Sequence, residues 1–154
     1  MGPAGPDAGS GSVPQRDYIL RLIEQMGRAL AELRRRILEG PVDPAEVRAE
    51  LDRALQGVGL DADLALRASP ETLELMILGG GEVDPTRAWV LAEALYIQGL
   101  GADAAGDPDT AHGAWIRALR LYELILPSAT FYGLDEAEER RTDVLARLQA
   151  LDTG

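Results

Sequence analysis

Apolar residues recur at a spacing of three and four positions from Asp17 onward, which places them on one face of an α-helix. The pattern ends at Gly40-Pro41, a pair that stops helices. The chain therefore predicts a helix of about six turns between these two points. Its apolar face consists of Ile19, Leu22, Ile23, Met26, Leu30, Leu33 and Ile37.

Most of this face also fits the a and d positions of consecutive heptads, as in a coiled-coil seam that would join two copies into a homodimer. Leu22 and Ala29 widen the stripe beyond a strict seam, and a wide stripe is typical of a helix that packs on its own core. We therefore favour internal packing and keep the homodimer as the alternative. The seam residues are Ile19, Ile23, Met26, Leu30, Leu33 and Ile37.

Further helices are predicted where Asp or Ser precedes Pro, because the first side chain can cap a helix and Pro suits its first turn. These pairs are Asp43-Pro44, Ser69-Pro70, Asp84-Pro85 and Asp107-Pro108. Glu46 follows Asp43 at the spacing of a capping box, in which Asp43 accepts a hydrogen bond from the Glu46 N–H and Glu46 reaches back. A short helical turn from Asp61 and a last helix from about Asp135 complete the set.

No stretch alternates apolar and polar residues between turn signals, so we predict an all-α fold of six to seven helices in antiparallel hairpins, closed by a C-terminal capping helix. Residues 1–14 are predicted to form a disordered tail, and 15–154 a single helical domain. Within that domain, Gly79-Gly80-Gly81 is the best candidate for a hinge or boundary between helices over 15–79 and a hairpin with a capping helix over 84–154.

Four small residues, one tryptophan and one leucine stand in the segment from about Ala92 to Ile125 where two closely packed helices would touch. They are Gly99, Gly106, Ala111, Trp115, Ala118 and Leu119. The segment resembles one tetratricopeptide repeat (TPR). Gln98, Ala102 and Glu123 depart from that pattern, which has Leu, an aromatic residue and Pro there. The alternative is an unrelated tight helical hairpin, which also needs small residues at its crossing point.

The opening D-Y-I-L-R-L-I-E-Q, together with this hairpin, is also similar to a small bacterial family of unknown function with a TPR-like C-terminal half. That resemblance implies no catalytic motif and no ligand. All 15 basic residues are Arg, which is typical of a GC-rich bacterial genome.

Repeats of the TPR kind hold a peptide or a partner's helix on the inner face of their first helix. The resemblance places Glu93, Tyr96, Leu100 and Asp103 on that face. An aromatic residue among carboxylates favours a basic partner segment with an apolar anchor. The alternative is that Tyr96 and Leu100 are buried beneath the N-terminal helices.

Composition excludes several classes of function. A net charge of -11 repels nucleic acid, and a chain without Cys has neither disulfides nor a thiol nucleophile. No apolar run reaches the roughly 18 residues of a membrane span, and the N-terminus lacks a leader pattern, so we expect a cytoplasmic protein.

Candidate chemistry is sparse. His112 lacks a neighbouring nucleophile motif, and the Asp residues at 61 and 63 and at 103, 107 and 109 fit helix caps better than a calcium loop. Glu138 to Arg141 is interpreted as a solvated helix face. We expect no metal, no cofactor and no catalysis. The sequence favours a non-enzymatic protein–protein interaction module, with a homo-oligomeric structural protein built on the first helix as the alternative.

Overall fold

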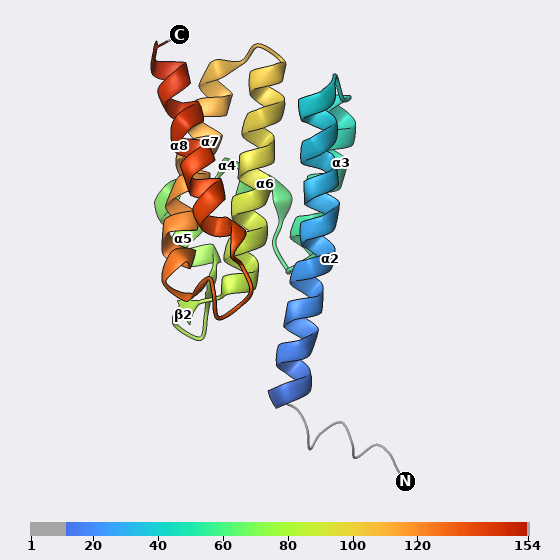
Figure 1. Cartoon of the computed structure of the whole chain (residues 1–154), viewed down its shortest axis with the longest axis vertical. Helices are drawn as coiled ribbons and strands as arrows, with labels where there is room; N and C mark the ends of the chain where they lie inside the picture. Colours follow the sequence, from blue (N-terminus) through green and yellow to red (C-terminus); the bar gives the residue numbers. More distant parts are fainter. Residues whose placement is uncertain (1–11, 154) are drawn as a thin grey trace.

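The computed structural model describes residues 12–153, apart from the side chains of residues 12–16, 19, 20 and 23. Seven α-helices and one two-stranded sheet are present in this part of the chain, so the predicted all-α fold of six to seven helices is confirmed (Figure 1). The elements are α2 (Ser12–Glu39), α3 (Pro44–Gly57), α4 (Ala62–Arg67), α5 (Pro70–Met76), β1 (Leu78–Gly79), β2 (Glu82–Val83), α6 (Pro85–Ala104), α7 (Pro108–Ile125), the 3-10 helix η1 (Leu126–Ser128) and α8 (Glu136–Thr153).

Helix α2 begins earlier than its apolar pattern predicts. Residues 1–11 of the predicted tail lie outside the described residues, but 12–14 belong to α2, which corrects the predicted start at Asp17. Pro14 is compatible with this start because the first turn of a helix does not use its backbone N–H groups.

The predicted caps are all formed. Asp61, Ser69, Asp84 and Asp107 each accept a hydrogen bond from a backbone N–H in the first turn of the helix that follows. Asp43 also caps α3, but the predicted capping box with Glu46 is wrong.

Asp43 accepts from the Ala45 N–H at 3.0 Å, and the Glu46 carboxylate forms an ion pair with Arg36 of α2 instead of reaching back. The ion pair with Arg36 therefore takes the place of the predicted contact between the Glu46 side chain and the Asp43 backbone N–H.

The three glycines form a tight hairpin. Leu78 pairs with Val83 and Gly79 with Glu82, and Gly80 and Gly81 occupy the turn with φ of 65° and 88°. Both values lie in the left-handed region, which glycine adopts at low cost. The turn joins α5 directly to α6, and the role of this segment as a hinge or boundary stays a prediction.

Helix α6 is the centre of the molecule. It lies between α2 and α3 on one side and α7 and α8 on the other, and it runs antiparallel to α7 (Figure 1). A Cβ atom added at Gly99 would overlap the indole ring of Trp115 on α7, so the two backbones approach as closely as the small residues predict. Ala111, Trp115 and Ala118 are fully buried, Leu119 is half-buried, and Gly106 makes the intervening turn at a φ of 79°.

The two halves of α2 differ. Leu30, Leu33 and Ile37 are buried in the chain's own core, as the internal-packing interpretation expects. Among the described side chains from Asp17 to Ala29 none is fully buried, although Leu22 and Met26 pack partly against the core. The first turns of the helix extend beyond the rest of the molecule (Figure 1). Of the other seam residues, Met26 lies against Gly57, whereas the side chains of Ile19 and Ile23 are outside the described set.

Candidate functional site

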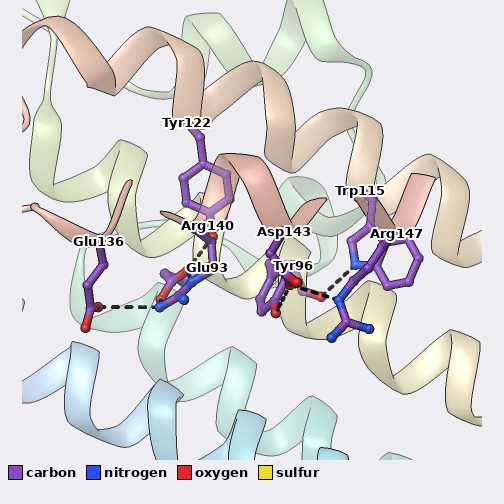
Figure 2. Close-up of polar contacts among 8 residues, drawn as sticks. All are labelled: Glu93, Tyr96, Trp115, Tyr122, Glu136, Arg140, Asp143 and Arg147. Atoms are coloured by element: carbon purple, nitrogen blue, oxygen red, sulfur yellow. Dashed lines mark hydrogen bonds and ion pairs between the residues drawn. The ribbon is translucent and has the colours of Figure 1, made fainter. Parts of the chain in front are cut away.

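A buried ion pair joins the central helix to the last one. Glu93 of α6 and Arg140 of α8 are only 4% and 5% exposed. The Arg140 Nε donates to Glu93 Oε1 at 2.8 Å and its Nη2 donates to Oε2 at 3.1 Å (Figure 2). The hydroxyl of Tyr122 on α7 donates to the same carboxylate, so three helices meet at Glu93.

A second polar cluster lies one turn further along α6. The Tyr96 hydroxyl donates to Asp143 Oδ2 at 2.5 Å, and the Arg147 Nε donates to the same oxygen at 2.8 Å. The Arg140 guanidinium lies over the Tyr96 ring, 5.5 Å from its centre, and links the two clusters through a cation–π contact. The Trp115 indole N–H donates to the Tyr96 carbonyl at 3.1 Å (Figure 2). The Arg147 guanidinium lies over the indole ring, 5.9 Å from its centre.

The pKa shifts agree with this hydrogen-bond pattern. Burial, and then the hydrogen bond to Asp143, raise the pKa of Tyr96 to about 12, and burial beside Glu93 raises the pKa of Tyr122. Burial alone would raise the pKa of Asp143, but the hydrogen bonds from Tyr96 and Arg147 outweigh it and hold that pKa below its usual range. At neutral pH the two tyrosines are thus protonated donors, and Asp143 is an ionised acceptor. The network is a clamp between α6, α7 and α8, in which Glu93 and Asp143 each accept hydrogen bonds from two residues. The exposed Glu136 carboxylate also pairs with Arg140, at 3.4 Å.

Three of the four residues expected to form a binding groove lie inside the molecule. Glu93, Tyr96 and Leu100 are buried, and only Asp103 is exposed. This corrects the expected open face, because α8 lies over α6 at Glu93 and Tyr96. Burial was the alternative interpretation, although α8 provides the cover there rather than the N-terminal helices alone. Of the two carboxylates that favoured a basic partner, Glu93 is paired with Arg140, whereas Asp103 is exposed, and the basic partner stays a prediction.

The sequence interpretation missed Arg140. Glu138 and Glu139 are exposed as expected of a solvated face, but Arg140 is not. A signal was present, because Arg140 follows Ala137 by three positions and precedes Val144 by four, and both are fully buried. The spacing therefore places this arginine on the apolar face of α8.

An open groove remains beside the network. We call it the α2–α8 groove; it has a volume of about 420 Å³, with Tyr96 at its floor. Its walls are formed by Arg34, Arg35, Leu38 and Glu39 of α2 and by Glu139, Arg140, Asp143 and Arg147 of α8.

Most charges in the α2–α8 groove are paired within the chain. Arg35 binds Glu39, and Arg147 binds Asp143. Arg34 on one wall and Glu139 on the other have no ion pair with any residue that the structure describes.

The remaining chemical candidates do not assemble. His112 is exposed on α7, and the nearby Ser69 hydroxyl binds Thr72 as part of the α5 cap rather than the imidazole. Within residues 12–153 no three His, Asp or Glu side chains converge as metal ligands. No helix in the same range combines the length and apolar character needed to cross a membrane.

No family model, no curated protein and no solved structure matches this chain. The resemblance to a tetratricopeptide repeat therefore remains an interpretation of the sequence pattern.

Proposed function

We propose that this chain is a non-enzymatic interaction module that binds a segment of another cytoplasmic protein in the α2–α8 groove. The observation that carries the proposal is the exposure of an apolar side chain beside an unpaired arginine. Leu38 is 55% exposed on the wall of the groove, and Arg34 lies four positions before it, one turn along the same helix. Arginine is among the residues that dominate binding energy at protein interfaces.

The charges of the groove indicate the chemistry of the partner. Arg34 on α2 suits an acidic residue, and Glu139 on α8 suits a basic one. An apolar side chain between these two residues would cover Leu38. We therefore expect a helical or extended segment that carries an apolar anchor flanked by residues of opposite charge.

The pairing of the buried groups supports a binding role over catalysis. Glu93, Arg140 and Tyr122 satisfy one another in the interior, and Asp143 is held by two donors. A general base needs a lone pair directed at a substrate, and these carboxylates direct theirs at protein donors.

Selection from a random peptide library displayed on phage tests the proposal. We expect enriched peptides with the apolar and mixed-charge pattern, and roughly tenfold weaker binding to the Arg34→Glu variant. Arg28→Glu is the matched control, because Arg28 is exposed on the same helix, has no ion pair with a described residue and lies outside the groove. Equal binding to both variants would place the interaction elsewhere, and a library without enriched peptides would contradict the binding function.

The alternative function is a homo-oligomer assembled through α2. The first half of α2 favours it, because only Leu22 and Met26 among its described side chains pack even partly on the chain's own core, and helical segments with little packing are marginally stable in water. A second copy that packs along the heptad positions would cover it.

Sedimentation velocity at micromolar concentration distinguishes the two functions. A dimer that becomes a monomer in the double variant Ile19→Glu, Ile23→Glu would support the homo-oligomer. A monomeric parent chain would rule it out and leave the groove as the proposal.

A further inference from the structure

A second cavity lies on the opposite side of α6 from the ion pair. It is bounded by the turn between α2 and α3, by α3 itself and by the C-terminal end of α6, and we call it the α3–α6 pocket. Its volume is about 460 Å³, within the range of small-molecule sites. Its walls are mainly apolar and include Ile37, Val42, Val47, Leu51, Leu66 and Ala102.

Two residues of α6 that depart from the tetratricopeptide pattern lie at the pocket. Ala102 stands where that pattern has an aromatic residue, and Gln98, one turn earlier, stands where it has Leu. Both residues line the pocket. The small side chain of Ala102 leaves space that a ring would fill, and Gln98 adds a polar group to an apolar wall.

The charged residues at the rim are already paired. Arg48 binds Asp52 and Asp63, and Asp107 accepts hydrogen bonds from Thr110 at the start of α7. The rim therefore provides no unmatched charge for a ligand to neutralise.

The Gln98 carboxamide is the exception among the polar groups of the wall. Its Oε1 is buried without a hydrogen-bond partner, and no described residue bonds to either end of the amide. A buried acceptor without a partner is unfavourable. The amide can turn toward a bound molecule without breaking any hydrogen bond in this part of the chain.

We infer that the α3–α6 pocket binds a small, uncharged, mainly apolar molecule that bears one amide or hydroxyl group for Gln98. Apolar walls take the body of such a ligand, and a single polar contact sets its orientation. The absence of unmatched charge at the described rim disfavours carboxylates, phosphates and amines. This inference does not depend on the α2–α8 groove.

Titrations with three ring compounds of similar size test the inference: benzamide, toluene and benzoate. Two-dimensional NMR of the labelled protein measures binding and identifies the residues whose signals shift. We expect benzamide to shift signals of pocket residues with the highest affinity, toluene to bind more weakly at the same place, and benzoate to bind least. Shifts that lie outside the pocket, or no saturable shift with any probe, would overturn the inference.

Two variants sharpen the test. Gln98→Leu should weaken benzamide binding roughly threefold to tenfold, the loss expected for one hydrogen bond, and leave toluene binding unchanged. Ala102→Phe should abolish binding of both by filling the space. If Ala102→Phe does not fold, Gln98→Leu alone decides, because equal loss of both probes or of neither would contradict the role of the amide.

Discussion

Two polar residues of α6 differ in whether their buried oxygens have hydrogen-bond partners among the described residues. Glu93 and Gln98 are five positions apart and point about 140° away from each other around the helix. Glu93 faces α7 and α8, where Tyr122 of α7 and Arg140 of α8 satisfy both of its oxygens. Gln98 lines an apolar pocket, where its buried oxygen has no partner among the described residues. A polar group with a complete set of partners holds the scaffold together, whereas one without partners is available to a molecule from outside.

The largest expected effect is the loss of the carboxylate at the satisfied position. Glu93→Gln leaves the buried Arg140 guanidinium with only the exposed Glu136 carboxylate, 3.4 Å from its Nη2, so we expect the free energy of unfolding to fall by as much as about 3–5 kcal/mol in urea denaturation. The double variant Glu93→Leu, Arg140→Met is the control and should lose much less, because it removes both charges. A loss below about 1 kcal/mol for the single variant would contradict the clamp.

Removal of the Tyr96 hydroxyl should have the next largest effect. Tyr96→Phe deprives ionised Asp143 of a donor and should cost roughly 1.5–3 kcal/mol at neutral pH.

The same hydroxyl makes stability depend on alkaline pH. The pKa of Tyr96 is raised from about 10 in the unfolded chain to about 12 in the fold, so its contribution is complete below pH of about 10 and is lost as the pH rises through about 12. Urea denaturation over this range should show a decline that is smaller in Tyr96→Phe. An identical decline in both proteins would contradict this assignment.

A methyl group at the closest helix approach should cost roughly 1–3 kcal/mol. Gly99→Ala forces the Trp115 ring away from α6. Gly101→Ala on the same helix is the control, since nothing lies within 4 Å of the added methyl group, and it should stabilise by about 0.5–1 kcal/mol. Thermal unfolding of the two variants gives the comparison, and changes of the same sign would refute the close approach.

The smallest effect should have the opposite sign to the first. Gln98→Leu removes a buried acceptor that lacks a partner, so we expect a gain of about 1 kcal/mol in the free energy of unfolding. Gln56→Leu, at an exposed position of α3, is the control for added apolar surface and should change stability little. A loss of stability in Gln98→Leu would mean that the amide already has a structural role.

The helix boundaries, apart from the start of α2, could be predicted because their signals are local. Asp84 and Asp107 cap the helices that follow them within three residues, and the spacing of Leu30, Leu33 and Ile37 identifies the buried face of α2. Gly99 and Trp115 also predicted the tight hairpin, because a position where two helices lie this close has room only for a very small side chain opposite a large one. The candidate site was predicted only in part, since Tyr96 was named but was expected on an open face.

The sequence by itself thus determined the helices, their order and the crossing of α6 with α7, because each depends on residues within one element or in adjacent ones. Only the tertiary structure decided which polar residues are paired. The partner of Glu93 is 47 positions away on α8, and the docking of that helix closed one face of α6. On the other face of α6, Gln98 lies in a pocket, and no described side chain reaches its amide.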